Sequence, residues 1–366
     1  MISFLIWAIL GLYVVIYLLG IIHFKIKPTV PKSLTEYLPV SIVIAVRNEE
    51  KNLHVLLSSL ISQDYPQNLM EVIIGDDQSE DNSLQILRDY AQQFPWIKVV
   101  SIKEKVGNLM GKQNVLAQLI PLATHENILI TDADIQLSNQ WVKIMVAHLK
   151  DKAMVSAPTI VEGNELFHHL QSLDWIFSIS IIKPFSDWGL PITAVGNNMG
   201  FKKSEYLKIG GYENLPFSLT EDYLLFKKMI LQNHGQFDWV HLPEVLNISK
   251  PTEDWNTFLH QRKRWYEGAK KGPWYALLIF VVHVLINPAL LTGFLVFSLP
   301  FAWNLWFIKW VMDFIWLVNS CSALNKKHLL RYFLPFQIYF FVISIVLPVY
   351  FLTSKKVLWK NRVYEV

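Results

Sequence analysis

Acidic residues at two places in the sequence could supply the chemistry of a metal-assisted reaction. Asp76 and Asp77 directly follow one short apolar run, and Asp132 and Asp134 directly follow another. If both runs are strands of one open parallel sheet, the four carboxylates face one crevice at the carboxyl ends of the strands. There they would repel one another unless a cation lies between them. Oxygen ligands of this kind favour Mg²⁺ or Mn²⁺, which a bound diphosphate would share.

A third acidic pair and a basic, aromatic segment follow later in the chain. Glu221 and Asp222 come after Thr220 and precede a run with helical spacing, and Gln261-Arg-Lys-Arg-Trp265 comes shortly before an apolar stretch. Each has a simpler structural explanation. Thr220 and the two acids could be present simply to cap a helix. The basic segment could be present simply to lie on anionic lipid headgroups. A single Asp at a strand end is likewise most often a turn residue or a cap.

The elements that would position these residues lie between residues 35 and 250. Short apolar runs typical of strands are separated there by segments with helical spacing. The runs are Val40–Val46, Glu71–Gly75, Ile97–Ile102 and Asn127–Thr131. This alternation predicts an α/β domain with a mainly parallel sheet and helices on both faces.

Apolar segments flank this domain on both sides. Residues 1–24 are long enough to cross a hydrocarbon core of ~30 Å as a helix, and they lack the basic start and small-residue cleavage site of a signal peptide. We therefore expect an N-terminal transmembrane helix. After an interfacial segment, 251–275, we expect two to three spans in residues 276–353 and a basic tail in residues 354–366. The candidate spans are Ala276–Pro300, Trp303–Ala323 and Leu334–Thr353.

Basic residues predict the orientation of these spans. Lys25, Lys27 and Lys32 follow the first span, so the positive-inside rule places the following domain in the cytoplasm. A third full C-terminal span would put the basic tail on the opposite side, against the same rule. We therefore expect Leu334–Thr353 to be a re-entrant or interfacial element with a cytoplasmic tail. A full span that breaks the rule is the alternative.

The composition argues against nucleic-acid binding and against cysteine-based sites. A net charge of +3 is too small to indicate a nucleic-acid partner, and basic residues beside apolar runs suit a membrane surface better. Cys321 is the only cysteine, which excludes a disulfide within the chain and a cysteine zinc site.

Taken in order, the Asp-Asp, Asp-x-Asp, Glu-Asp and Gln-x-x-Arg-Trp motifs before apolar spans resemble the inverting family 2 glycosyltransferases. The resemblance runs from Ser41 to about Ala269. Two positions depart from the family pattern: Asn361 stands where Gly is usual, and Ser249-Lys-Pro-Thr252 lacks the acid expected before Pro-Thr. The other stretches that agree are Val46-Arg-Asn-Glu-Glu50, Gly111-Lys-Gln-Asn114, Gly196-Asn-Asn-Met-Gly-Phe201, Gly210-Gly-Tyr212, and Trp359-Lys-Asn-Arg362 with Tyr364.

The resemblance implies a GT-A nucleotide-sugar-binding fold and a role for each matching residue. The residues expected to hold the nucleotide sugar are Arg47, Glu49, Asp76, Asp77, Lys112 and Asp132. Asp134, together with Asp132, would ligate Mg²⁺ or Mn²⁺. Asp222 would be the general base, with Glu221 beside it. The residues expected on the diphosphate and acceptor side are Glu221, Gln261, Arg264 and Trp265.

The resemblance also implies an activity, which is metal-dependent transfer with inversion from a nucleotide-diphosphate sugar, expected to be a UDP-sugar. One N-terminal anchor with few C-terminal spans resembles ceramide glucosyltransferases and carotenoid glycosyltransferases, which favours a membrane lipid acceptor. Processive polysaccharide synthases share Gln-x-x-Arg-Trp but usually carry more spans, so a synthase that makes a glycan is an alternative. A transporter or a non-catalytic scaffold is another, although a transporter should have repeated halves, which are absent from the sequence, and a scaffold would be expected to have lost its acids.

Overall fold

The computed structural model describes residues 1–26, 36–359 and 362–365, with the side chains from residue 358 onward left aside. Lys27 and Lys32 of the orientation prediction, Thr35 at the predicted domain boundary and Asn361 of the tail motif lie outside the described residues. The chain divides into two compact units. We call Thr29–Ile160 with Phe185–Lys250 the sheet unit, and Met1–Pro28, Val161–Pro184 and Pro251–Val366 the helical unit.

The sheet unit is built on seven strands in the order β3-β2-β1-β4-β7-β5-β8. The first four in this order are parallel to one another and correspond to the four predicted strands. Three of them are runs of mainly β-branched and aliphatic residues that the two layers of helices bury, whereas the edge strand, Ile97–Ser101, has exposed residues at its second and last positions. Their bounds are β1 (Val40–Val46), β2 (Met70–Asp76), β3 (Ile97–Ser101) and β4 (Asn127–Asp132).

The other half of the sheet was not predicted. β7 (Asn198–Lys202) runs antiparallel to β4 and to β5 (Met154–Ser156), and β8 (Phe237–Trp239) runs parallel to β5. Beside the main sheet, β6 (Thr159–Val161) pairs with β9 (Asn247–Ser249). The predicted α/β fold with a mainly parallel sheet is confirmed, with β7 as the antiparallel insertion.

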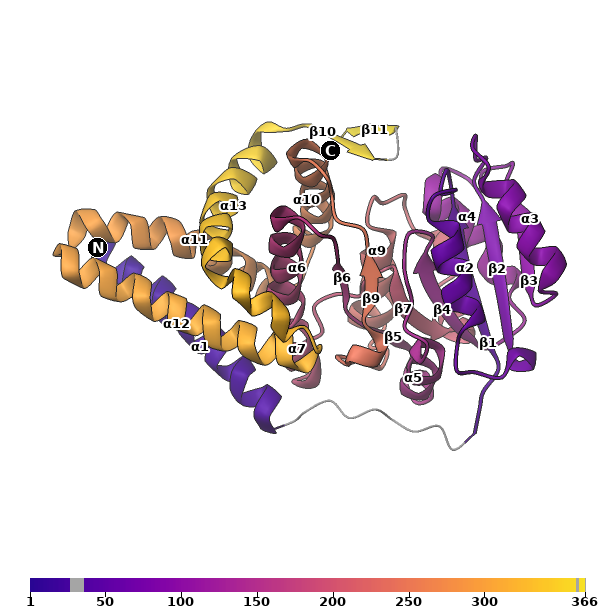
Figure 1. Ribbon diagram of the computed structural model, residues 1–366, viewed down its shortest axis with the longest axis horizontal. Coiled ribbons are helices and arrows are strands. Elements are labelled where there is room, and N and C mark those ends of the chain that lie inside the picture. Colours follow the sequence, from indigo (N-terminus) through magenta and orange to yellow (C-terminus); the bar gives the residue numbers. More distant parts are fainter. Residues whose placement is uncertain (27–35, 360–361, 366) are drawn as a thin grey trace. The chain divides into compact units, whose positions relative to one another are not determined.

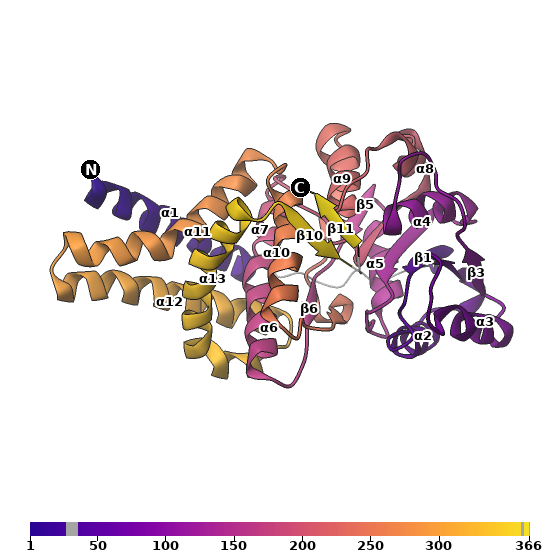
Figure 2. The same ribbon diagram turned by 90° about the horizontal axis from the view of Figure 1, so that it is seen from above.

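Helices cover both faces of the sheet, each over its own apolar core. α2 (Leu53–Ile61), α3 (Ser83–Gln93) and α5 (Trp141–Leu149) pack on one face. On the other face lie α4 (Gly111–Leu119), α8 (Lys203–Lys208) and α9 (Glu221–Phe226), the last continued by a π-helical turn, Lys227–Gln232. Figure 2 shows α2 and α3 on one side of the strands and α4 and α8 on the other.

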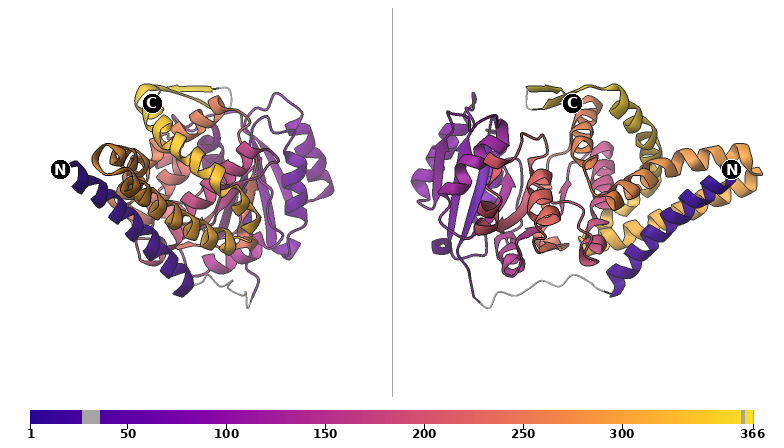
Figure 3. Two further views of the ribbon diagram at one scale, coloured as in Figure 1. Left: turned by 60° about the vertical axis from the view of Figure 1, so that its left-hand side comes forward. Right: turned by 180° about the vertical axis from the view of Figure 1, so that it is seen from behind.

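The helical unit contains four helices that are long and apolar enough to cross a membrane. They are α1 (Ile2–Ile26), α11 (Trp274–Val296), α12 (Leu299–Ala323) and α13 (Phe333–Thr353). α1 lies along α11 and α12 (Figure 3). α13 continues through Pro348 as one helix of 21 residues, so its length fits a full span, and the side of the membrane on which the tail lies stays a prediction.

A polar cluster lies buried among these apolar helices. Lys309 and Asp313 on α12 form an ion pair of 2.7 Å, with side chains fully buried. The hydroxyl of Tyr13 on α1 donates to Asp313, and Lys309 also donates to Gln337 on α13, at 2.8 Å. Buried charges need such partners, and three of the four spans supply them.

Two further helices of the helical unit lie outside the candidate spans. α6 (Leu166–Ile179) packs on α12 and α13, and α10 (Trp255–Ala269) packs on α13. The strand β10 (Lys356–Trp359) pairs with β11 (Arg362–Glu365) in a hairpin that also contacts α10 (Figure 1). The short helix α7 (Ile182–Asp187) follows α6.

Candidate active site

Lys112 lies at the centre of the acidic residues in the sheet unit. Its ammonium is 2.6 Å from a carboxylate oxygen of Asp132 and 3.2 Å from one of Glu221. It also donates to the carbonyl oxygen of Gly196, at 3.1 Å. Four segments that are far apart in the sequence therefore meet at one cation, and three of the predicted site residues are brought together.

Two glycines allow α4 to hold Lys112 in this place. Gly111 starts the helix with φ at +56°, a left-handed conformation that glycine adopts without strain. Gly75 lies on β2 beneath α4, where an added Cβ would come within 2.5 Å of Val115. The missing side chain lets the helix pack closely on the strand.

The charges in this cluster depend on one another. Burial alone would lower the pKa of Lys112, but Asp132 and Glu221 raise it above its ordinary value. Burial raises the pKa of Glu221, and the attraction of Lys112 offsets only part of that rise. The ammonium thus balances carboxylates that would otherwise be buried close together without compensation.

Backbone amides hold Asp222 in a fixed position. The amide of Gly196 donates to one carboxylate oxygen and the amide of Tyr223 to the other, both at 2.8 Å. A Cβ on Gly196 would lie 2.7 Å from the Cβ of Asp222, so this approach requires glycine. Thr220 makes no side-chain cap bond to the helix. A half-buried carboxylate fixed in this way could accept a proton from a hydroxyl placed beside it.

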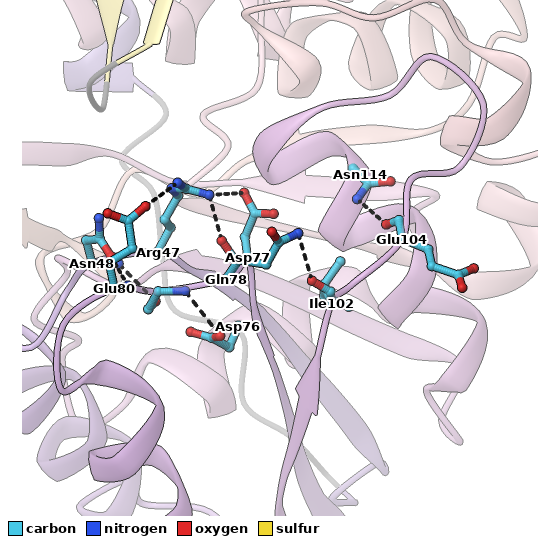
Figure 4. A network of polar contacts seen from close by, with 10 residues as sticks. Arg47, Asn48, Asp76, Asp77, Gln78, Glu80, Ile102, Glu104 and Asn114 are labelled. Atoms are coloured by element: carbon cyan, nitrogen blue, oxygen red, sulfur yellow. Dashed lines mark hydrogen bonds and ion pairs between the residues drawn. The ribbon is translucent and has the colours of Figure 1, made fainter.

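Arg47 connects the ends of β1 and β2. Its guanidinium donates to the carbonyl of Asp77 at 2.9 Å and lies 3.3 Å from Glu80, and Figure 4 shows these contacts. One oxygen of Asp76 accepts from the amide of Ser79, while the other is buried and has no hydrogen-bond partner among the described residues. Glu49 is buried and accepts from Asn52 at 2.6 Å.

Asp134 follows β4 and is only partly exposed. The hydroxyl of Ser249, in the Ser249-Lys-Pro-Thr252 stretch that lacks the acid expected before Pro-Thr, donates to it at 3.3 Å. Within the described part of the chain, no three His, Cys, Asp or Glu side chains are placed to hold a metal by themselves. Mg²⁺ and Mn²⁺ commonly bind through one or two carboxylates together with substrate phosphates, so Asp132, Asp134 and the unpartnered oxygen of Asp76 fit such an ion.

Tyr212 is a further candidate, and its place in the Gly210-Gly-Tyr212 stretch predicted no role for it. Its hydroxyl is buried and has no hydrogen-bond partner among the described residues. Burial raises its pKa, and the neighbouring charges of Glu221, Asp222 and Asp132 raise it further. Buried hydroxyls are usually bonded, so an unpartnered one beside these carboxylates makes Tyr212 a candidate residue of the site. The Gly210-Gly-Tyr212 stretch drew attention to this residue, but residue types alone do not predict that its hydroxyl is buried near three carboxylates.

The remaining predicted residues belong to the helical unit. Gln261, Arg264 and Trp265 lie on α10, where the ring of Trp265 packs edge-on against Trp175 of α6, with centroids 4.8 Å apart. Their roles at the diphosphate and acceptor stay predictions from the motif, as do the roles of all the residues named above.

Residues 4–366 match the family model described as Glycosyl transferase family 21. The chain belongs to glycosyl transferase family 21. The predicted membrane glycosyltransferase of GT-A type is confirmed, with family 21 as the family that matches. The fold of the family 21 chain is similar to that of the mannosyltransferase PcManGT from Pyrobaculum calidifontis, with a TM-score of 0.62 and 18% identity over 97% of this chain and 100% of that chain.

Curated relatives of this family 21 chain are glycosyltransferases as well. It is 24% identical to the probable glycosyltransferase YdaM of Bacillus subtilis, over 76% of this chain and 66% of that protein. It is 25% identical to a poly-beta-1,6-N-acetyl-D-glucosamine synthase of Staphylococcus epidermidis, over 63% and 54%. It is 35% identical to a beta-monoglucosyldiacylglycerol synthase of Trichormus variabilis, over 37% and 29%. The chain thus spans less than two thirds of the length of these relatives.

Proposed function

We propose that this glycosyltransferase moves a sugar from a nucleotide-diphosphate sugar to a hydroxyl group of a membrane lipid, with inversion at the anomeric carbon. The observation that carries the proposal is Asp222, which two backbone amides fix beside the cluster of Lys112, Asp132 and Glu221. A fixed carboxylate next to a charged donor site is what a single displacement requires.

In the proposed reaction the acceptor oxygen attacks the anomeric carbon as the bond to the diphosphate breaks. Asp222 takes the proton of the acceptor hydroxyl, so the nucleophile is activated as the leaving group departs. Lys112 keeps its positive charge and holds Asp132 and Glu221 in place throughout. Gly196 acts through its backbone, because its amide orients the base and its carbonyl orients Lys112.

The donor side follows from the acids at the strand ends. Arg47, Glu49, Asp76 and Asp77 would bind the nucleoside, with UDP as the expected nucleotide. Asp134 and Asp132 would hold Mg²⁺ or Mn²⁺, an ion that offsets negative charge on a departing diphosphate. The structure of PcManGT is a complex with GDP-Man and Mn²⁺, which supports a nucleotide-sugar donor and a divalent ion here.

A lipid acceptor is supported by the position of the Gln-x-x-Arg-Trp motif. It lies on α10, which packs against the candidate span α13, and α11 begins at Trp274, soon after α10 ends at Ala269. A motif so close to candidate spans is well placed to meet a lipid hydroxyl at the headgroup level. The name of the Trichormus variabilis relative, a glucosyl lipid synthase, agrees with this class. We further propose that the sheet unit lies on the cytoplasmic side.

The proposal is tested with the purified full-length protein, radiolabelled nucleotide sugars and mixed bilayer lipids. We expect one discrete lipid-soluble product, formed with Mn²⁺ or Mg²⁺ and lost when EDTA is added. Asp222→Asn should lower kcat by ~10²–10⁴-fold, as the loss of a general base does, while equilibrium binding of UDP stays at the wild-type level. Asp64→Asn, the same exchange in a surface ion pair with Lys143, is the matched control and should keep the wild-type activity.

Two outcomes would contradict the proposal. If Asp222→Asn kept more than half of the wild-type rate, Asp222 would not be the base. If the product were a lipid-free polymer of high molecular weight, the chain would be a polysaccharide synthase, as the name of the Staphylococcus epidermidis relative suggests.

A further inference from the structure

Arg262 and Lys263, the two variable positions of the Gln-x-x-Arg-Trp motif, contact neighbouring helices of the helical unit. The guanidinium of Arg262 donates to the carboxylate of Asp174 on α6, at 2.5 Å. The ammonium of Lys263 donates to the carbonyl of Phe351 near the end of α13, at 2.7 Å. α10 is therefore attached to two different helices by adjacent residues of the motif itself.

The guanidinium of Arg262 also lies over two aromatic rings of α10. Its central carbon lies 4.5 Å from the centre of the Trp265 ring and 4.8 Å from that of Phe258. Trp265 in turn packs edge-on against Trp175, the residue after Asp174 on α6. One planar cation thus joins the carboxylate of α6 to the indole of α10, a combination that suits arginine and not lysine.

Asp174 is held from two sides. Besides Arg262, the hydroxyl of Tyr339 on α13 donates to it, at 3.3 Å. Burial raises the pKa of Asp174, and Arg262 offsets part of that rise. Burying an ion pair usually brings little net stability compared with apolar residues of the same size. Stability alone therefore does not explain why Arg262 and Asp174 are charged. The contacts that the pair makes with neighbouring side chains suggest another role.

We propose that Arg262 and Asp174 are positioning residues for the transfer reaction, because they fix the orientation of the Trp265 ring on α10. The inference rests on the proposed function, since it takes Trp265 as a residue of the acceptor side. Arg262 touches neither the donor nor the acceptor in the proposed reaction. It acts through Trp265, and Asp174 acts through Arg262.

The substitution Arg262→Lys separates positioning from folding. Lysine keeps a positive charge beside Asp174 but cannot cover the indole with a flat face. We therefore expect the protein to stay folded, with a slightly lower melting temperature from the lost ring contacts, while Trp265 turns. A misplaced active-site group lowers rates by about ten- to a hundredfold, so kcat should fall by that factor with the donor KM unchanged.

The ring position can be measured without any activity. The full-length protein is labelled with 5-fluorotryptophan in lipid nanodiscs, and the ¹⁹F resonance of Trp265 is identified by its loss in Trp265→Phe. Arg262→Lys should shift this resonance. Lys270→Arg is the matched control, a reverse exchange at the residue that directly follows α10, where an exposed ammonium pairs with Glu267, and it should change neither the spectrum nor kcat.

A double-mutant cycle tests whether Arg262 acts through Trp265. Arg262→Lys should add no further loss of kcat in the Trp265→Phe background. The inference is overturned if the resonance stays in place, if kcat of Arg262→Lys equals that of the wild type, or if the two losses multiply. A fully active Asp222→Asn would instead remove the proposed function, and the shift of the resonance would still report on the packing.

Discussion

Lys112 is the residue on which the charge balance of the candidate site depends. It lies between Asp132 and Glu221, and its side chain is mostly buried. In the proposed reaction a divalent cation would also approach Asp132. The ammonium and the metal ion would then share one carboxylate, and Glu221 and the Gly196 carbonyl would keep Lys112 in place. The same lysine can therefore stabilise the site before and after the donor binds.

Tyr212 gives the first prediction at this scale. Tyr212→Phe removes a buried hydroxyl that has no partner among the described residues. Such a group costs about 1–3 kcal/mol, so the melting temperature should rise. If the hydroxyl donates to a reacting group, its loss should also lower kcat/KM, by at least about tenfold. Both quantities are measured on the same purified protein.

Tyr206 provides a control, because its substitution should change the melting temperature in the opposite direction. The hydroxyl of Tyr206 accepts a hydrogen bond from the amide of Tyr212, at 2.9 Å. Tyr206→Phe leaves that amide without an acceptor, so the melting temperature should fall. A Tyr212→Phe protein that gains stability and keeps its full rate would show that the hydroxyl has no part in the reaction.

At the scale of the elements, Glu71 connects the amino ends of the strands. It lies on β2 and accepts from Ser41 on β1 and from Lys98 on β3, at 2.5 and 2.9 Å. The amide and hydroxyl of Thr124, which precedes β4, donate to it as well. Burial would raise the pKa of Glu71, but these hydrogen bonds outweigh it and lower the pKa to about 2.

These hydrogen bonds to Glu71 predict that the free energy of unfolding depends on pH. Because the folded state lowers the pKa, Glu71 stabilises the protein fully above its ordinary value of 4.5 and loses this contribution as the pH falls toward 2. Glu71→Gln should lower the free energy of unfolding at pH 7 by about 1.5–3 kcal/mol, the value of hydrogen bonds to a charged group. The difference from the wild type should shrink between pH 4.5 and pH 3.

Unfolding of the sheet unit, followed by near-ultraviolet circular dichroism in denaturant, measures this effect. Asp64→Asn, which breaks an exposed ion pair with Lys143, should change stability little at any pH. Transfer activity of Glu71→Gln should remain, since Glu71 lies at the end of β2 away from Asp76. A difference that stays constant down to pH 3 would contradict the prediction.

The elements also explain which parts of the molecule could be predicted from the sequence. β1, β2 and β4 are mainly apolar runs, and together with the more polar edge strand β3 they alternate with helices, which is a strong pattern. β7 was missed because its segment, Asn198–Lys202, contains a glycine and polar residues and pairs antiparallel through contacts distant in sequence. Asp76, Asp77, Asp132 and Asp134 were predicted from their place after strands, whereas the roles of Glu221 and Asp222 were predicted from the family resemblance. The amides that hold Asp222 were not, because a backbone donor leaves no mark on residue type.

At the scale of the whole molecule, the orientation of the chain in the membrane can be measured. Cys321 is the only cysteine and is buried, so it should give little background with an impermeant thiol reagent. Ser79→Cys and Ser138→Cys report on the sheet unit, which we expect to be labelled only after lysis. Ser298→Cys, exposed between α11 and α12, is the matched control and should be labelled in intact cells.

A fourth cysteine decides where the tail lies. Ser354→Cys follows α13 directly, and it should stay unlabelled in intact cells if the tail is cytoplasmic. Labelling at Ser79 or Ser138 in intact cells would reverse the orientation that Lys25 indicates. Labelling at Ser354 alone would make α13 a full span and Lys355 and Lys356 an exception to the positive-inside rule.

The buried pair on α12 has a consequence for how the protein is made. A charged residue at the centre of a span costs about 3 kcal/mol on insertion scales, and α12 carries both Lys309 and Asp313. When α12 leaves the ribosome, α1 with Tyr13 has already been synthesised, whereas Gln337 on α13 has not. The ion pair can therefore complete its hydrogen bonds only when the last helix arrives. The hydrogen bond from Tyr13 on α1 to Asp313 can thus form before the one from Lys309 to Gln337 on α13, which completes the buried cluster.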